Sequence, residues 1–441
     1  MLSKYSIHLV LWLLIQLLIK VNCQTPFRPS RRSSHTSTLI DGKLFILGGI
    51  DYKMNLTGKD FFYLDVSEPF NTQHLNWQDL TSINTVPAHI GAASVRGGAN
   101  NESLFLYGGI YDTNKDEMSL VYEFDTRRNT WLPQVISGNA IRKDSLKGIV
   151  DYNGKMYLFG GHSKDGTHYN DMIILDTIKL NWEVGSLINA PSPRSVYGAT
   201  LLSNQQIIYL GGSVNVMDNV TTSLNEVYLY DTINDSWSTK VTGGTIPGNR
   251  DAFSVVLGLD GQRIIIFGGR VEPQEALYVL DLINYEWYIP KLSGKMKIPL
   301  SRYWHEANVI EKYMVISYGK GYNFQIESDM LLLDISNNEE YIWTNVFDPK
   351  AIISSPKPTP TNSLTTSSKL QASAIIGIVI GAVSGNNYGQ EPIAIPIQSM
   401  NNYGQVINPY YYEQQISPIS QNYNSAIPQN YNSTIYNQST Y

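Results

Sequence analysis

Arginine at a fixed distance from a glycine recurs along this chain and offers the clearest binding chemistry in the sequence. Four arginines lie 16 to 18 residues before a glycine that ends a short apolar run. A guanidinium group presents paired donors that match the carboxylate of a ligand. The alternative is that each arginine pairs with an acid of a neighbouring repeat and stabilises the fold. The four are Arg32, Arg194, Arg250 and Arg302, with Arg142 or Lys143 in the similar place of another copy.

A second set of candidate binding residues follows the glycines, in segments of variable length. Aromatic side chains with one polar end suit contacts with a sugar or a peptide, and variable loops on a rigid framework are where binding residues concentrate. Ordinary loop composition is the alternative for each residue. The candidates are Tyr52, Tyr111, His162, Tyr169, Arg270 and Tyr322.

Motifs for catalysis are missing from the sequence. It contains no Gly-x-Ser-x-Gly nucleophile turn, no phosphate-binding loop and no metalloprotease histidine pair. His162 and His168 share one segment, but no third metal ligand is evident beside them. We therefore predict no catalytic residue, no metal and no cofactor.

The elements that must position these residues repeat six times. Each repeat has an apolar run that ends in glycine, a second apolar run that ends in aspartate, and then a tryptophan. Gly-Gly pairs begin at residues 48, 108, 160, 211 and 268, and the last copy runs from Val315 to Gly319 with Lys320 in place of the second glycine. The aspartates are Asp65, Asp125, Asp176, Asp231, Asp281 and Asp334, and the tryptophans are Trp77, Trp131, Trp182, Trp237, Trp287 and Trp343.

Each repeat predicts a blade of four strands. A strand such as 197–200 opens the blade, and the apolar run before the glycines forms a second strand that is buried on both faces. The glycines end that strand where the backbone needs a positive φ or a close approach to another blade. The aspartate starts a tight turn by accepting bonds from its own backbone. The tryptophan begins the outer strand and covers the neighbouring blade.

This order of glycine, aspartate and tryptophan resembles the kelch repeat family, from about Pro29 to Phe347. The resemblance implies an all-β fold, a six-bladed kelch β-propeller in which each blade buries its faces on its neighbours. The first blade begins with its own inner strand at 34–39, so the ring need not close by exchange of an N-terminal strand. In kelch propellers that bind acidic peptides, arginines at this position point into the central opening. The resemblance implies the same here, so that the ring could clamp a carboxylate or an acidic glycan.

Some members of this family are enzymes. A copper radical oxidase of the galactose oxidase type needs a tyrosine cross-linked to a cysteine, and Cys23 is the only cysteine here. An iron site of the plant specifier-protein type needs Glu, Asp and His at four-residue steps, and the sequence has no such run. Catalysis is therefore not the favoured interpretation, and a carbohydrate-active oxidase or sugar isomerase stays the alternative.

The N-terminal segment predicts an exported protein. Residues 1–23 have the pattern of a signal peptide, with Lys4 before an apolar stretch at 7–19 and a cleavage site before Gln24. The mature chain, whose propeller is expected at 24–348, then has no cysteine and forms no disulfide within the chain. The predicted location is secreted or at the cell surface, with a single-pass membrane protein as the alternative.

The composition changes twice after the propeller. Residues 349–373 are rich in Ser, Thr and Pro and predict an extended stalk or, as the alternative, a flexible linker. Residues 374–385 form a short apolar segment that would cross a membrane only as part of a longer span. Residues 386–441 are rich in Asn, Gln and Tyr and predict a disordered tail, which is prone to self-association or, as the alternative, passive. Candidate glycosylation sites, each at the start of an Asn-x-Ser/Thr sequon, are Asn55, Asn101, Asn219 and Asn234.

Charge and organisation together favour a recognition role. The net charge is −6 and no basic patch stands out, which argues against a nucleic-acid partner. We predict an extracellular binding or scaffold propeller that recognises a protein or glycan through one loop face. The alternatives are a carbohydrate-active enzyme and a self-associating wall or matrix protein.

Overall fold

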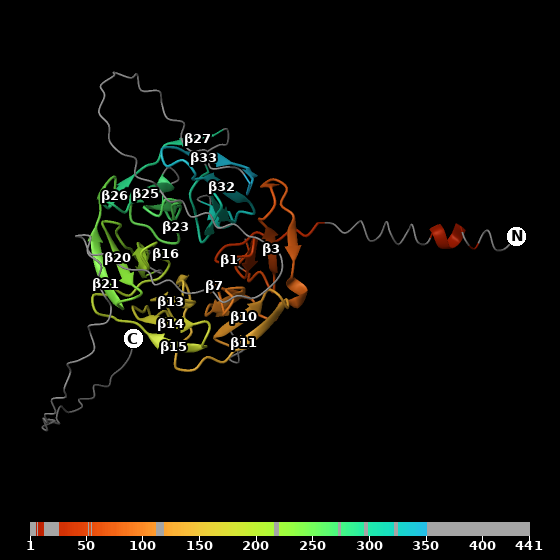
Figure 1. Cartoon of the computed structure of the whole chain (residues 1–441), viewed down its shortest axis with the longest axis horizontal. Coiled ribbons are helices and arrows are strands. Elements are labelled where there is room, and N and C mark those ends of the chain that lie inside the picture. The colour runs from red at the N-terminus through yellow and green to blue at the C-terminus, as the bar shows by residue number, and fades with distance from the viewer. Residues whose placement is uncertain are drawn as a thin grey trace, which may run out of the picture. The chain divides into compact units, whose positions relative to one another are not determined.

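The computed structural model describes residues 26–51, 53, 55–111, 119–215, 220–271, 275–294, 299–321 and 325–350, together with residue 6 and residues 8–12. Six sheets stand as blades of a ring, and the chain visits them in order (Figure 1). The prediction of an all-β, six-bladed propeller is confirmed. The predicted apolar segment and tail, and the predicted stalk from residue 351 on, lie outside the described residues, as does most of the predicted signal peptide. No helix within the described ranges is long and apolar enough to span a bilayer.

Each blade is built from strands that follow one another in the sequence, with the first strand innermost. Blade one contains β1 (Thr36–Ile40), β2 (Lys43–Leu47), β3 (Phe61–Asp65) and β5 (Trp77–Asp79). Blade two contains β7 (Ala93–Gly97), β8 (Ser103–Tyr107), β10 (Val121–Asp125) and β11 (Thr130–Gln134). Blade three contains β12 (Gly148–Val150), β13 (Lys155–Phe159), β14 (Met172–Asp176) and β15 (Asn181–Val184).

The second half of the ring follows the same plan, with an extra strand in two blades. Blade four contains β16 (Gly198–Leu201), β17 (Gln206–Leu210), β20 (Glu226–Asp231) and β21 (Ser236–Val241). Blade five contains β23 (Ser254–Leu257), β24 (Arg263–Phe267), β25 (Leu277–Asp281) and β26 (Glu286–Tyr288), with β22 (Gly243–Gly244) parallel to β26. Blade six contains β29 (Glu306–Ile310), β30 (Tyr313–Ser317), β32 (Met330–Asp334) and β33 (Tyr341–Thr344), with β27 (Leu292–Ser293) parallel to β33.

Two faces of the ring can be told apart by their connections. We call the face that carries the links from second to third strands the loop face, and the opposite face, which carries the turn at 41–42, the turn face. A 3-10 helix (Thr81–Ile83) precedes blade two. The short strand pairs are β6 (His89–Ile90) with β9 (Ile110–Tyr111), β18 (Ser213–Asn215) with β19 (Val220–Thr221), β28 (Arg302–Tyr303) with β31 (Lys320–Gly321), and β4 (Phe70–Asn71) with β34 (Val346–Phe347).

The second strands form the core, and the glycines after them let neighbouring blades touch. In β24 the residues from Ile264 to Phe267 are fully buried. Gly268 follows with a φ of 75°. A Cβ at Gly268 would lie 2.1 Å from the carbonyl oxygen of Arg302 in blade six, so only glycine fits there. The predicted reason for the recurring glycines is therefore confirmed.

The recurring aspartates and tryptophans also act as predicted. Oδ1 of Asp231 accepts the N–H groups of Ile233 and Asn234, each over 2.9 Å, and so shapes the turn before the outer strand. Trp237 then packs on Phe159 of blade three, with ring centroids 4.9 Å apart. The aspartate is thus a local turn former, while the tryptophan joins two blades.

The ring closes between blades one and six without exchange of a strand. β34 pairs with β4, and Phe347 stacks on Phe70 with ring centroids 4.6 Å apart. β4 lies in the insertion between Asp65 and Trp77, so the longer turn of the first repeat carries the closing contact.

One backbone hydrogen bond recurs between neighbouring blades and shows how the repeats align. The second glycine of each pair donates its N–H to a carbonyl oxygen at the start of the next blade, over 2.8–3.0 Å. In the last repeat Gly319 donates this bond to Arg32, so Tyr318, with a φ of 51°, holds the place of the first glycine. The prediction that Lys320 replaces the second glycine is wrong, because the glycine that is kept is the one whose N–H reaches the next blade. The acceptors around the ring are His89, Lys143, Arg194, Arg250, Arg302 and Arg32.

Candidate functional site

A closed ring of backbone hydrogen bonds surrounds the loop-face end of the central channel. Six residues, one from each blade, donate their N–H to the carbonyl oxygen of the equivalent residue in the preceding blade, over 2.7–3.1 Å. Each has a φ between 47° and 64°. For residues other than glycine this backbone conformation costs roughly 1–3 kcal/mol, and it concentrates at functional sites. We call these residues the collar: Ser34, Gly91, Ser145, Val196, Ala252 and Trp304.

All six collar residues line a cavity of about 240 Å³, which we call the loop-face cavity. Ile50 and Ile110 follow the glycine pairs of blades one and two, and Ile90 pairs with Ile110 across β6 and β9. These three side chains make that part of the wall aliphatic. A mostly apolar wall with a few fixed polar groups is typical of a ligand-binding cavity.

His162 supplies one polar part of the wall. Its Nδ1 lies 3.0 Å from Oδ2 of Asp144, and its ring lies against His168 with centroids 5.3 Å apart. Burial opposes protonation of His162, but the hydrogen bond and the charge of Asp144 outweigh it and raise the pKa of His162. Burial and the charge of His162 lower the pKa of His168. The pKa values of the two neighbouring imidazoles are thus shifted in opposite directions. Asp144 holds His162 in one orientation.

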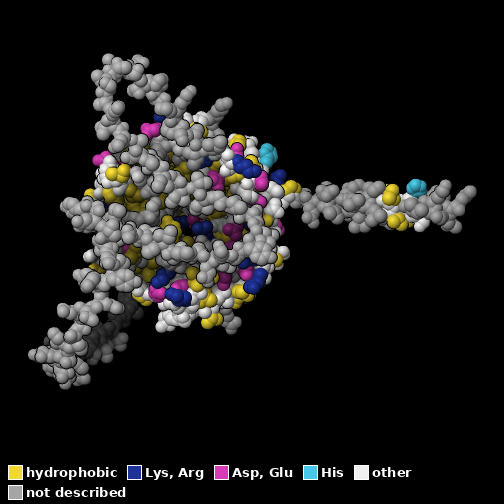
Figure 2. All heavy atoms as spheres, in the orientation of Figure 1, with side chains coloured by type: hydrophobic (Ala, Val, Ile, Leu, Met, Phe, Trp, Pro, Cys, Tyr) yellow, Lys and Arg dark blue, Asp and Glu magenta, His cyan; other side chains and the backbone are white. Residues whose placement is uncertain are grey.

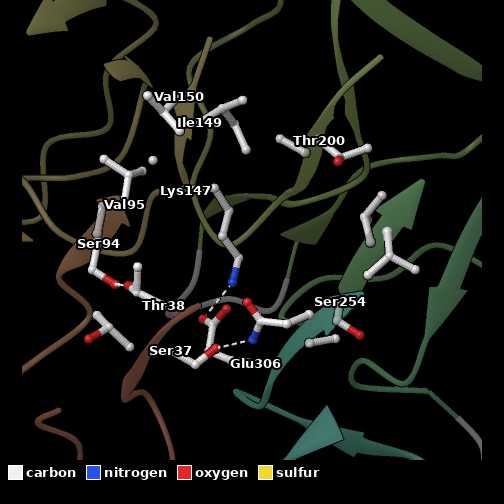
Figure 3. Close-up of a pocket in the computed structure, with 18 of the residues that line it drawn as sticks. Ser37, Thr38, Ser94, Val95, Lys147, Ile149, Val150, Thr200, Ser254 and Glu306 are labelled. Carbon is white, nitrogen blue, oxygen red and sulfur yellow. Dashed lines mark hydrogen bonds and ion pairs between the residues drawn. The ribbon is translucent and has the colours of Figure 1, made fainter. Parts of the chain in front are cut away.

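An ion pair crosses the channel beneath the loop-face cavity. Lys147 of blade three and Glu306 of blade six come from opposite sides of the ring, and Nζ lies 2.6 Å from Oε1 (Figure 3). Both residues also line a second cavity of about 520 Å³, which we call the turn-face cavity. The pair therefore stands between two cavities of one channel. Figure 2 shows basic and acidic side chains together at the centre of the ring.

The four predicted arginines are buried inside their blades and line neither cavity. Each is at most 6 % exposed. Nη1 of each donates, over 3.0–3.3 Å, to the carbonyl oxygen at the first-glycine position of the same blade. The expectation that they point into the central opening is wrong, because their guanidinium groups bond to the ends of the second strands. Contact with a ligand through them stays a prediction of the sequence. The residues are Arg32, Arg194, Arg250 and Arg302.

Acids of the same blade neutralise several of these cations. Nη2 of Arg32 lies 2.7 Å from Oδ2 of Asp60, which directly precedes β3. Lys143, and not Arg142, holds the equivalent place in blade three, and its Nζ lies 2.7 Å from Oδ1 of Asp171. The alternative prediction named an acid of the neighbouring blade. The partner belongs to the same blade because the acid sits at the start of the third strand, beside the second strand that the cation contacts. A buried cation without such partners would be costly.

Among the loop candidates, only His162 is described as lining the loop-face cavity. Tyr169 packs beneath the ammonium group of Lys143, 5.5 Å from Nζ to the ring centroid. Arg270 donates from Nε to Oδ1 of Asp251 over 2.7 Å. The remaining candidates are outside the described residues or have only their backbone described: Tyr52, Tyr322 and Tyr111.

Sequence reasoning missed the collar and the cross-channel ion pair. A signal for their positions exists, because every collar residue lies two residues after the residue that accepts the inter-blade bond, as Val196 follows Arg194. Lys147 and Glu306 each lie four residues after that point. An alignment of the repeats finds these positions, but only the folded ring shows that they surround one channel.

The predicted glycosylation sites can be placed in part. Asn55, Asn101 and Asn234 are exposed, and the side-chain amide of Asn234 donates to Oδ2 of Asp231 over 3.0 Å. Asn219 lies outside the described residues, and glycosylation stays a prediction for all four. Within the described part of the chain, no group of three or more His, Cys, Asp or Glu side chains could hold a metal ion.

Similar proteins are known for most of the chain. Residues 35–238 and 200–377 match the KLHDC2/KLHL20/DRC7 Kelch-repeats domain. The chain is 26 % identical to human host cell factor 2 over 263 residues, which cover 56 % of this chain and 32 % of that protein. It is 24 % identical to bovine kelch domain-containing protein 3 over 292 residues, which cover 62 % of this chain and 74 % of that protein. The chain therefore spans about a third of host cell factor 2.

Among solved structures, the one titled "Structure of YjhT" superposes with a TM-score of 0.56 at 13 % sequence identity. The superposition covers 73 % of this chain and 99 % of that one. At this identity the likeness concerns the fold alone.

Proposed function

The chain belongs to the kelch-repeat β-propeller family, and from that premise we propose that it is a protein-binding module that takes an apolar side chain of its partner into the loop-face cavity. Propellers of this family typically bind proteins. The observation that carries the proposal is the cavity of about 240 Å³ within the collar, with its aliphatic wall. Its place on the loop face matches where binding residues concentrate on rigid frameworks.

The energetics of such an anchor are favourable. A leucine or phenylalanine side chain that leaves water for this cavity would contribute roughly 1.5–3 kcal/mol. The collar loses little conformational freedom on binding, because hydrogen bonds already hold each of its residues on both sides. Polar groups beside the anchor, such as the Oγ of Ser145 and the His162–Asp144 pair, would orient the partner's backbone.

Selection of peptide binders by the full chain from a random displayed library tests the proposal. We expect the selected peptides to share one large apolar residue. The variant Ile90→Asp places a carboxylate in the cavity wall and should weaken binding at least tenfold, or about 1.4 kcal/mol. Ile283→Asp is the matched control, because Ile283 is 74 % exposed and lines neither cavity.

Three outcomes would overturn the proposal. They are equal binding by both variants, selected peptides without a shared apolar residue, and a library that yields no binder. Thermal unfolding of each variant, followed by circular dichroism, establishes that a loss of binding is not a loss of fold.

We further propose that the module acts outside the cell or at its surface. The support is the signal-peptide pattern of residues 1–23. N-terminal sequencing of the chain from the medium of expressing cells should begin at Gln24. A chain that keeps Met1 and stays in the cytosol would overturn this location and leave the binding proposal intact. A glycan partner, and membrane attachment through residues 374–385, stay predictions of the sequence.

A further inference from the structure

The turn-face cavity has chemistry that protein binding at the loop face does not use. Its volume of about 520 Å³ lies within the range of about 300–1,000 Å³ that small-molecule sites occupy. Its walls are the inner strands of the six blades and the residues just before them (Figure 3). Backbone pairing therefore holds the walls in place, and the site is formed before a ligand arrives.

The pairing of each inner strand with its second strand shows which lining residues of the six blades stand at the same height along the channel. Glu306 pairs with Ser317, the last residue of its second strand, and Lys147 stands at the same level because the next residue, Gly148, pairs with Leu158. Three residues closer to the turn face, every inner strand presents a side chain that is exposed or half-buried and that lines the cavity. These six side chains are Leu39, Arg96, Val150, Leu201, Leu257 and Val309.

The two ends of the cavity therefore differ in chemistry. The deep end is the Lys147–Glu306 ion pair. Three residues of β-strand separate it by about 10 Å from the outer level. There Arg96 takes one of six places and aliphatic side chains take the other five. We call these five the aliphatic ring: Leu39, Val150, Leu201, Leu257 and Val309.

Small hydroxyl side chains line part of the space between these levels. Ser37 and Ser94 stand there, and the Oγ of Ser37 accepts a hydrogen bond from Nδ2 of Asn308 over 2.6 Å. The Oγ of Ser94 lies 2.6 Å from Oγ1 of Thr38. These hydroxyl groups already have partners in the wall, so the charge that the cavity offers a ligand comes from the ion pair at its deep end and from Arg96 at its outer level.

A zwitterion matches the deep end better than a single charge does. The Lys147 ammonium has three protons, and within the described residues its acceptor is Oε1 of Glu306. A ligand carboxylate can accept from a further proton of Lys147, while a ligand ammonium donates to Glu306, so every charge keeps a partner. A lone anion would stand beside Glu306 without compensation, and a lone cation would stand beside Lys147.

We propose that the turn-face cavity binds a free α-amino acid with a large apolar side chain. Its carboxylate contacts Lys147, its ammonium contacts Glu306, and its side chain packs in the aliphatic ring. The ion pair borders both cavities, but the aliphatic ring lines only the turn-face cavity, so variants of that ring test this proposal separately from the protein-binding proposal.

A titration series separates the three parts of this ligand. Isothermal titration of the full chain with phenylalanine should give a Kd of about 1 mM or tighter. N-acetylphenylalanine lacks the ammonium, phenethylamine lacks the carboxylate and glycine lacks the apolar body, so each should bind at least tenfold more weakly. No heat from phenylalanine up to about 10 mM, or equal affinity for phenylalanine and N-acetylphenylalanine, would overturn the proposal.

Variants of the ion pair test whether Lys147 and Glu306 contact the ligand or only stabilise the fold. Lys147→Met and Glu306→Gln should each weaken phenylalanine binding at least tenfold. The double variant Lys147→Glu/Glu306→Lys should restore it, because an exchanged pair accepts the zwitterion in the reverse sense. A double variant that folds and binds no better than the single variants would overturn the proposal.

The aliphatic ring has its own variant and control. Leu257→Asn should weaken phenylalanine binding at least fivefold and leave glycine unaffected, since glycine has no side chain to pack there. Ile283→Asn, outside both cavities, should bind phenylalanine like the original chain. Equal affinity of these two variants for phenylalanine would contradict the placement of the side chain.

Discussion

Acidification should destabilise this propeller through a buried histidine. His89 is 2 % exposed, and its carbonyl oxygen accepts the inter-blade bond from Gly49 over 2.8 Å. Its Nδ1 lies 2.7 Å from the carbonyl oxygen of Pro87. Burial lowers the pKa of His89 from 6.5 to about 4, against the opposing effect of the Pro87 carbonyl. The imidazole of His89 is therefore neutral in the folded protein at pH 7.

The sign of the effect follows from which state binds the proton first. The unfolded chain takes up the proton near the ordinary histidine pKa of about 6.5, and the folded chain only near 4. The stabilisation is therefore complete above about pH 6.5 and is lost as the pH falls toward 4. The pKa difference corresponds to about 3.4 kcal/mol. About 2.5 kcal/mol of it is lost between about pH 7.5 and pH 4.5.

Urea unfolding followed by tryptophan fluorescence measures this loss. The original chain and His89→Gln would be compared at about pH 7.5, 6.0 and 4.5, because the glutamine amide can donate to the Pro87 carbonyl without titrating. The original chain should lose about 2.5 kcal/mol more than the variant across that range. Carboxylates whose pKa is lowered, such as that of Asp176, titrate at lower pH and affect both chains alike. Parallel curves for the two chains would refute the reasoning.

Two further predictions concern the contacts between blades. Gly268→Ala should cost about 3 kcal/mol or more of unfolding free energy, because the new Cβ would lie 2.1 Å from the Arg302 carbonyl oxygen at a φ of 75°. Gly58→Ala, with a φ of 72° and no atom within 4 Å of the new Cβ, should cost only about 1 kcal/mol, and equal losses in urea would contradict the close approach. Phe347→Ala should cost roughly 3–5 kcal/mol, because this fully buried ring joins the last blade to the first through Phe70. An unchanged thermal midpoint would mean that the ring closes through other contacts.

Sequence alone was sufficient for the blades, because each recurring residue acts within one repeat or against the next. The aspartate of each repeat, such as Asp231, shapes the turn with its own neighbours in the chain. Glycine at 268 is required by a backbone conformation and by one nearby carbonyl group. These interactions are local to one repeat or to two adjacent repeats, so the spacing of the residues in the sequence is enough to predict them. Six copies of one pattern therefore predicted six blades.

The direction of a side chain was harder to predict than its position. Arg32 lies 16 residues before Gly48 in the sequence, and in the folded blade Nη1 of Arg32 bonds to the Gly48 carbonyl oxygen over 3.0 Å. Spacing along the chain does not distinguish a guanidinium group that faces the channel from one that bonds inside its blade. The acid that settles the matter, Asp60, is 28 residues away and comes close only when the third strand pairs with the second.

The sequence by itself determined the fold class, the number of blades, and the roles of the recurring glycine, aspartate and tryptophan. Only the tertiary structure decided the collar, the closing contact and the ion pair across the channel. Lys147 and Glu306 are 159 residues apart in the chain and meet because six blades leave a channel narrow enough for two long side chains to bridge. The other four blades carry small residues at this level, which leave room for the bridge: Thr36, Ala93, Gly198 and Ser254. The width of that channel depends on how many blades close the ring and how they pack, and no single repeat encodes it.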